Sequence, residues 1–219
     1  MRKEFSANVS HELKTPLTSI SGYAEIMKDG LVRPEDMKTF SERIYNEASR
    51  LITLVEDIMK LSKLDEGAVE LEKEEVDFYM LTREICSRLA PQAEKRHVRV
   101  EVTGEPVHYL GVRQVLDEML YNMIENAIKY NKEGGLVSVW VGNTLQGIKI
   151  IVRDTGIGIP KEEQERIFER FYRVDKSHSK ATGGTGLGLS IVKHGALMHG
   201  AKIDVDSEVN KGTKMELIF

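Results

Sequence analysis

The sequence is poor in cysteine and proline and contains no long apolar run. A single cysteine, Cys86, excludes an internal disulfide framework and a cysteine-rich zinc site. Because Cys86 falls among apolar residues in a helical pattern, we expect a buried structural thiol. No apolar run approaches the roughly 18–20 residues needed to span a bilayer, and no signal peptide opens the chain.

Neither sign of charge dominates the chain. The formal net charge of −4 gives no reason to expect nucleic acid as a partner. With 41% hydrophobic and 30% charged residues, the 219 residues predict a packed, soluble fold of one large domain or two modest ones. An amphipathic pattern already runs within a few residues of Met1, which suggests a chain cut from something longer.

The first part of the chain carries two apolar stripes separated by residues 29–36, which include glycine and proline. The first stripe contains Val9, Leu13, Leu17, Ile20, Ala24 and Met27, and the second contains Met37, Phe40, Ile44, Leu51, Leu54, Ile58 and Leu61. This pattern predicts an antiparallel helical hairpin. Because a lone hairpin covers only part of each stripe, we expect a homodimer that forms a four-helix bundle. The alternative is a hairpin packed on the second domain of its own chain.

The pattern changes after a charged stretch at residues 64–75, so we expect a hairpin domain at 1–66, a connector at 67–76 and a second domain at 77–219. In the second domain, helices are predicted at 78–96, 114–129, 161–171 and 187–199, and strands at 98–104, 136–142, 147–154, 201–208 and 213–219. This alternation predicts an α+β fold in which helices cover one face of a sheet.

A polar cluster, "NVSHELKTP", interrupts the first helical pattern at residues 8–16. At about 100° per residue, His11 falls about 200° from Val9 and Thr15 about 240°, so both lie away from the apolar stripe, with Glu12 on its flank. An exposed imidazole beside a carboxylate is a candidate nucleophile, because Glu12 can accept a proton from one ring nitrogen. Such a pair also fits an ordinary surface. The other histidines, His97, His108, His178, His194 and His199, lack metal-ligand spacing and are predicted to be surface or packing residues.

Two segments of the second domain carry residues suited to a nucleotide. Asn122 and Asn126 share one helix face, and Lys129 and Tyr130 follow one turn later. Carboxamide oxygens suit Mg²⁺, and a lysine suits phosphate. In "DTGIGIP", Asp154 precedes Gly156 and Gly158; its carboxylate can accept a hydrogen bond from the exocyclic amine of adenine, while the glycines allow close approach of the backbone.

A glycine-rich stretch with Gly183, Gly184, Gly186 and Gly188 precedes the predicted helix at 187–199. Exposed backbone amides at a helix N-terminus favour an anion. The pattern is neither the Rossmann fingerprint nor a P-loop. The basic residues before it, Arg170, Arg173, Lys176 and Lys180, fit either a flap over a triphosphate or a solvated charged loop.

In this order, the segments resemble the N, G1, F and G2 boxes of the sensor histidine kinases of two-component systems, with Phe168 and Phe171 in the F box. The stretch "FSANVSHELKTPLTSISGY" resembles the H box of the same family, so the resemblance covers nearly the whole chain. It implies a dimerisation and histidine-phosphotransfer hairpin followed by an ATP-binding α/β sandwich of the gyrase, Hsp90, kinase and MutL superfamily.

The resemblance also implies residue roles. His11 would be the phosphoacceptor, Glu12 its proton acceptor, and Thr15 would orient water for dephosphorylation of a response regulator. Asn126 would bind Mg²⁺ with Asn122 beside it, Asp154 would read adenine, and Arg173 would reach the γ-phosphate. The remaining nucleotide-binding residues would be Lys129, Tyr130, Gly156, Gly158, Gly184, Gly186, Leu187 and Gly188.

ATP and Mg²⁺ are the cofactors that this resemblance implies, and a second copy and a receiver domain are the partners. It further implies a cytoplasmic region of a membrane-anchored sensor, with the membrane reached only through a region upstream of Met1. Two alternatives stay open. An ATP-hydrolysing clamp of the superfamily usually carries glutamate where Asn122 stands, and a catalytically inactive scaffold would bind nucleotide only.

Overall fold

The computed structural model describes residues 2–66, 72–174 and 184–219. Contacts divide the chain into two units, Met1–Ser62 with Gly183–Thr185, and Lys63–Thr182 with Gly186–Phe219. Among the described helices, none combines the length and the apolar character that a membrane crossing requires.

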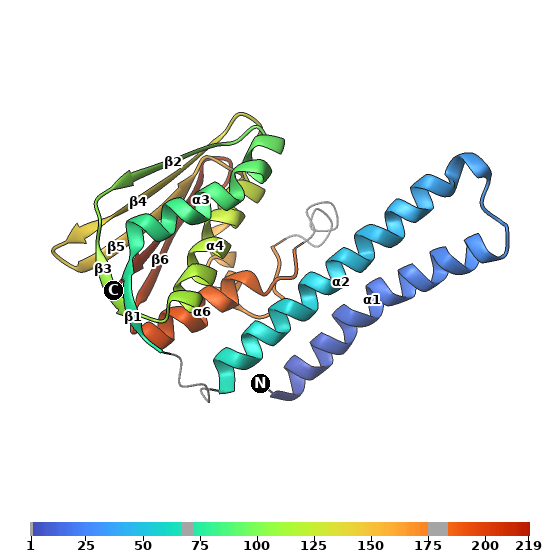
Figure 1. The fold of residues 1–219 in the computed structure, drawn as a ribbon, viewed down its shortest axis with the longest axis horizontal. Helices are drawn as coiled ribbons and strands as arrows, with labels where there is room; N and C mark the ends of the chain where they lie inside the picture. The colour runs from blue at the N-terminus through green and yellow to red at the C-terminus, as the bar shows by residue number, and fades with distance from the viewer. Residues whose placement is uncertain (1, 67–71, 175–183) are drawn as a thin grey trace. The chain divides into compact units, whose positions relative to one another are not determined.

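The first unit is the predicted helical hairpin (Figure 1). Helix α1 (Arg2–Lys28) and helix α2 (Met37–Glu66) are joined by a turn that contains the short 3₁₀ helix η1 (Pro34–Asp36). Pro16 removes one backbone donor within α1, yet the helix continues through it. Across the hairpin, the rings of Tyr23 and Phe40 meet edge to face at 5.6 Å. The predicted end of α2 at Gly67 lies outside the described residues.

The hairpin covers only part of its apolar surface. Val9, Leu13 and Ile20 are half-buried, whereas Leu17 in the same stripe is 51% exposed. Helix α2 also carries a second apolar stripe with a period of seven, formed by Tyr45, Ile52 and Met59, which are 72%, 60% and 56% exposed. An uncovered apolar face of this kind marks a surface suited to further packing.

The second unit contains a five-stranded sheet with the strand order β2-β4-β5-β7-β6. Its strands are β2 (Arg99–Gly104), β4 (Leu136–Thr144), β5 (Gly147–Asp154), β6 (Lys202–Glu208) and β7 (Gly212–Ile218). Strands β2 and β4 run parallel, and the other neighbours are antiparallel. Helices α3 (Phe78–Lys95), α4 (Arg113–Lys129) and α6 (Gly188–His199) lie on one face of the sheet (Figure 1). The α+β fold is therefore confirmed.

Apolar residues alternate along the strands and recur with helical periodicity in the helices, and together they form one core between the sheet and the helices. Val137, Val139 and Val141 of β4 are fully buried, and Met119 and Ile124 of α4 pack in the same core. Helix α3 begins at the N-cap Asp77, whose Oδ1 accepts hydrogen bonds from the amides of Tyr79 and Met80 at 2.9 and 3.1 Å.

Two strands were absent from the sequence prediction. Strand β1 (Glu74–Asp77) begins within the predicted connector and pairs antiparallel with β3 (His108–Gly111). Each has four residues, which is too short for alternation to distinguish a strand from a loop.

The helix predicted at residues 161–171 is wrong. The segment forms two 3₁₀ turns, η2 (Lys161–Glu163) and η3 (Arg166–Phe168), and Phe171 takes a left-handed φ of +66°. Local polar contacts replace the helix: the Tyr172 hydroxyl donates to Glu163, and the guanidinium of Arg166 lies 4.2 Å from the centre of the Tyr172 ring.

His199 fastens the end of α6 to the start of α4. Its Nε2 accepts a hydrogen bond from the amide of Val112, the N-cap of α4, at 3.1 Å, and its Nδ1 lies 2.8 Å from the Gly195 carbonyl. Burial lowers the pKa of His199, so the ring is held neutral. This confirms His199 as a packing residue and fixes the helix that carries the two asparagines.

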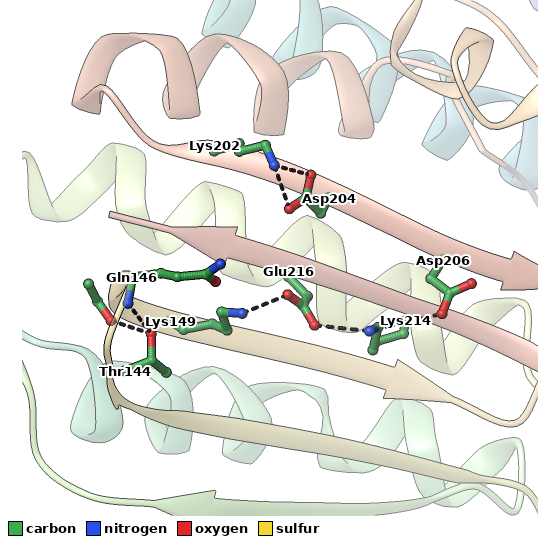
Figure 2. A network of polar contacts seen from close by, with 9 residues as sticks. Thr144, Gln146, Lys149, Lys202, Asp204, Asp206, Lys214 and Glu216 are labelled. Carbon is green, nitrogen blue, oxygen red and sulfur yellow. Dashed lines mark hydrogen bonds and ion pairs between the residues drawn. The ribbon is translucent and has the colours of Figure 1, made fainter.

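The face of the sheet away from the helices carries an ion-pair network (Figure 2). Glu216 of β7 lies opposite Asp204 of β6 in the register, so two like charges are neighbours. Lys149 and Lys214 relieve this repulsion, since their ammonium groups lie 3.0 and 3.1 Å from the Glu216 carboxylate. The hydrogen bond from Lys149 is the main reason that the pKa of Glu216 falls below its ordinary value of 4.5.

We predict that Glu216→Gln lowers the free energy of unfolding by about 1 kcal/mol at pH 7, because Lys149 and Lys214 both lose their contact with the Glu216 carboxylate. Since the folded pKa lies below the unfolded one, the contribution of Glu216 is present above about pH 4.5 and is lost as the pH falls through the folded pKa. Urea unfolding, followed by the fluorescence of Trp140, the single tryptophan, measures the free energy of unfolding of both proteins at pH 7 and at a series of pH values below 4.5.

The matched control is Glu208→Gln, which removes an exposed pair with Lys211 and should change stability by a few tenths of a kcal/mol at most. An equal loss in the two variants, or a loss for Glu216→Gln that does not decrease as the pH is lowered below about 4.5, would contradict a stabilising network on this face.

Candidate functional site

Asn122 and Asn126 lie on one half-buried face of α4, as predicted. The Asn122 amide donates to the Glu118 carbonyl at 2.8 Å, and its Oδ1 lies against the first residue of α6. A Cβ added at Gly188 would stand 2.4 Å from that oxygen, so a larger residue there would displace the Asn122 carboxamide. The Asn126 carboxamide makes no hydrogen bond within the described chain, which leaves its oxygen available to a ligand.

Asp154 ends β5 with its carboxylate oriented by the backbone. Its Oδ1 accepts hydrogen bonds from the amides of Gly156 and Thr213, at 2.8 and 3.2 Å. Within the described residues, Oδ2 receives none, so it remains an acceptor for an outside donor. Burial raises the pKa of Asp154, and the two backbone hydrogen bonds oppose that rise.

The two glycines after Asp154 are required by contacts within the protein itself. A Cβ at Gly156 would stand 2.3 Å from the Tyr130 carbonyl oxygen. A Cβ at Gly158, where φ is +68°, would stand 2.0 Å from the Glu208 carbonyl oxygen. The close backbone contacts at these glycines are made with α4 and the β6–β7 hairpin, and the predicted approach of this backbone to adenine stays a prediction.

The end of α4 is joined to this loop. The amide of Ile157 donates to the Tyr130 carbonyl at 3.1 Å, and Arg96 donates to the Lys129 carbonyl at 2.8 Å. The Lys129 ammonium lies 5.5 Å from the centre of the Tyr130 ring. These bonds place Lys129 and Tyr130 beside the loop that follows Asp154.

The turn before α6 packs under the segment that contains Phe171. The Phe171 amide donates to the Gly186 carbonyl at 2.9 Å, and a Cβ at Gly186 would stand 2.8 Å from the carbonyl carbon of Phe171. Leu187 is fully buried beside this turn, and Arg173 is half-buried. Gly184 is not assigned to the second unit. Gly183, Lys176, Lys180 and His178 lie outside the described residues.

The three residues predicted on the hairpin take the expected faces of α1. His11 and Thr15 are exposed, and Glu12 is half-buried on the flank. The Thr15 hydroxyl donates to the His11 carbonyl at 3.2 Å. The Glu12 carboxylate lies 3.9 Å from the guanidinium of Arg50 on α2, a partner that no local pattern could indicate.

Sequence reasoning missed two further links around the site. Asn131, just after α4, accepts a hydrogen bond from the Thr155 hydroxyl at 3.2 Å and donates to the Leu136 carbonyl at 3.1 Å. Arg170, expected in either a basic flap or a solvated charged loop, lies 2.9 Å from the Nε2 of His194 on α6. Both links join residues more than four positions apart, so helical spacing gave no signal for them.

The second unit thus brings together the half-buried carboxylate of Asp154, the carboxamides of Asn122 and Asn126, and the N-terminus of α6 at Gly188. Residues 111–219 match the family described as histidine kinase-, DNA gyrase B- and HSP90-like ATPase, and residues 1–67 match the His Kinase A (phospho-acceptor) domain.

Similar proteins carry both parts. The chain is 40% identical over 219 residues to the sensor-like histidine kinase SenX3 of Mycolicibacterium smegmatis, covering 99% of this chain and 56% of that protein. Two solved structures are each 27% identical over 98% of this chain. One is full-length ShkA in complex with AMPPNP (TM-score 0.70, 45% of that chain covered), and the other is the histidine kinase ThkA in complex with the response regulator TrrA (TM-score 0.75, 60% covered).

The chain therefore belongs to the sensor histidine kinases of two-component systems. It spans about half the length of the curated relative SenX3.

We predict that Gly158→Ala lowers the free energy of unfolding by more than 3 kcal/mol, because left-handed backbone strain is combined with a collision against a fixed carbonyl. Gly134→Ala is the matched control, since Gly134 has φ of +72° and open space around it, and it should cost about 1 kcal/mol. Chemical unfolding of both variants measures the difference. Equal losses would show that the Glu208 carbonyl does not confine this loop.

Proposed function

We propose that the chain transfers the γ-phosphoryl group of ATP to His11 and then to an aspartate of a response-regulator receiver domain. The observation that carries the proposal is the exposure of His11 beside the half-buried Glu12, on a hairpin that matches the phospho-acceptor domain. Phosphoryl transfer depends mainly on positioning and charge neutralisation. A nucleophile on one unit and a nucleotide bound to the other are therefore sufficient for the transfer to His11.

The chemical step balances with the groups present on the hairpin. One ring nitrogen of His11 attacks the γ-phosphorus, the bond from that phosphorus to the β–γ bridging oxygen breaks, and ADP leaves. The proton on the other ring nitrogen passes to Glu12. The Glu12 carboxylate lies on the flank of α1, 3.9 Å from the guanidinium of Arg50. In the second transfer, the phosphoryl group leaves His11 for the receiver carboxylate.

The second unit offers matching contacts for ATP and Mg²⁺. Asp154 would accept a hydrogen bond from the exocyclic amine of adenine through its available Oδ2. Asn126 would supply a carboxamide oxygen to Mg²⁺, with Asn122 beside it, and the metal would neutralise charge on the phosphates. The N-terminus of α6 at Gly188 would face the phosphates.

The remaining nucleotide contacts follow the family motifs. Lys129 and Tyr130 would flank phosphate and base, and Arg173 would reach the γ-phosphate. Gly156, Gly158, Gly184, Gly186 and Leu187 would shape the walls of the site. The complex of ShkA with AMPPNP supports use of an adenine nucleotide.

Two partners complete the proposal. A second copy would cover the exposed stripe of Tyr45, Ile52 and Met59, giving a homodimeric four-helix bundle. A receiver domain would dock on the hairpin near His11, and the complex of ThkA with TrrA supports a partner of this class. We assign residues 1–66 to dimerisation and phosphotransfer, 67–76 to a connector and 77–219 to ATP binding.

Dephosphorylation of the receiver is the second activity that we propose for the hairpin. Thr15 lies one turn after His11 on the exposed side of α1, where its hydroxyl would hold a water against the phosphoaspartate. The chain would act as the cytoplasmic region of a membrane-anchored sensor, with the anchor in the part of the protein outside this sequence.

We predict that incubation with γ-labelled ATP and Mg²⁺ labels the protein, and that His11→Gln abolishes the label while ATP binding stays within about twofold. The label should be stable in base and lost in acid, as expected for a phosphoramidate. Filter binding and nucleotide titration measure the two properties. Label retained in His11→Gln, or release of inorganic phosphate without labelled protein, would refute the proposed phosphoacceptor.

A further inference from the structure

A side-chain link joins α6 to the segment that precedes Phe171. Arg170 Nη2 lies 2.9 Å from His194 Nε2, and His194 Nδ1 lies 3.0 Å from the carbonyl oxygen of Ser190, one turn earlier in α6. The Ser190 hydroxyl in turn donates to the Leu187 carbonyl at 2.7 Å, at the start of the helix. All of these groups are buried or half-buried in the second unit.

The chemistry of the two side chains fixes the direction of each hydrogen bond. A guanidinium only donates, so Nε2 of His194 must be the acceptor. The hydrogen of the neutral ring is then on Nδ1, which donates to the Ser190 carbonyl. His194 thus holds Arg170 with one ring nitrogen while the other ring nitrogen is held by the backbone of α6.

This link lies next to the proposed phosphate-binding end of α6. Arg170 is adjacent in sequence to Phe171, whose amide donates to Gly186, two residues before α6 begins at Gly188. Gly188 contacts Asn122 on the other side. The turn before α6 is therefore held between α4 and the segment at 170–171, and the side-chain link with His194 fixes that segment.

We infer that His194 is a positioning residue for nucleotide binding. By accepting a hydrogen bond from Arg170, it holds residues 170–171 against the turn before α6, and so keeps the backbone amides of that turn in the arrangement that receives the phosphates of ATP. This rests on the proposed function and adds a residue outside the glycine motif to it.

Two substitutions of His194 distinguish the hydrogen bond at Nε2 from the hydrogen bond at Nδ1. In His194→Gln, the side-chain amide oxygen can take the place of Nε2 and accept from Arg170. In His194→Asn, the shorter amide can replace Nδ1 and reach Ser190, but it offers no acceptor at the position of Nε2, so the hydrogen bond between Arg170 and residue 194 is lost. We expect His194→Asn to raise the KM for ATP in autophosphorylation about tenfold, the effect of losing one charge-assisted hydrogen bond. The kcat should change by less than about twofold, and His194→Gln should stay within about twofold of the native KM.

The adjacent Lys193 supplies the matched control for helix propensity, because it is exposed on the same turn of α6. Lys193→Asn and Lys193→Gln make the same pair of changes without touching Arg170, and their KM values should be equal. Thermal unfolding of every variant reports whether the second unit folds.

Arg170→Met tests the link from its other end and serves where His194→Asn does not fold. It should raise the KM at least as much, because it removes every contact of the guanidinium. The double variant Arg170→Met/His194→Asn should show no rise beyond that of Arg170→Met, because the interaction with His194 is already lost. Equal KM values for His194→Asn and His194→Gln, or single effects that multiply in the double variant, would overturn the inference. A native chain that binds no ATP would instead refute the proposed function, so the two failures are distinguishable.

Discussion

The half-buried carboxylate of Asp154 is the constraint on which the proposed nucleotide site depends. Two backbone amides bind the same oxygen, Oδ1, and thereby fix the direction in which Oδ2 points. Because burial raises its pKa, the charged form costs folding free energy at neutral pH, and that cost is relieved only as the pH falls through the raised pKa. A residue that weakens the fold at its working pH is typical of a ligand-binding position.

The other parts of the site are arranged around this fixed point by backbone contacts. The loop after Asp154 is bound to the end of α4 through Tyr130, and α4 meets the start of α6 where Asn122 contacts Gly188. At the first junction, the Tyr130 carbonyl leaves no room for a Cβ at Gly156, and at the second, a Cβ at Gly188 would displace the Asn122 carboxamide. The hairpin differs, because His11 is exposed on its surface and its apolar stripes are only partly covered.

Local periodicity predicted the two long helices, α3, α4, α6 and the five strands of the main sheet, because each carries a repeated buried face. It failed for β1 and β3, which are too short to alternate, and for residues 161–171, where contacts of Tyr172 and Arg166 replace helix formation. At the site, the sequence indicated Asp154, both asparagines and His11. The sequence could not indicate Arg50 as the partner of Glu12, or His194 as the partner of Arg170, because only the folded chain brings these residues together.

The affinity of the native chain for ATP compared with inosine triphosphate, in the presence of Mg²⁺, tests the role of Asp154 most directly. Inosine carries a carbonyl oxygen where adenine carries its exocyclic amine, and the fixed Oδ2 cannot donate to it. Inosine triphosphate should therefore bind at least about tenfold more weakly than ATP. Equal affinity for the two nucleotides would contradict this role of Asp154.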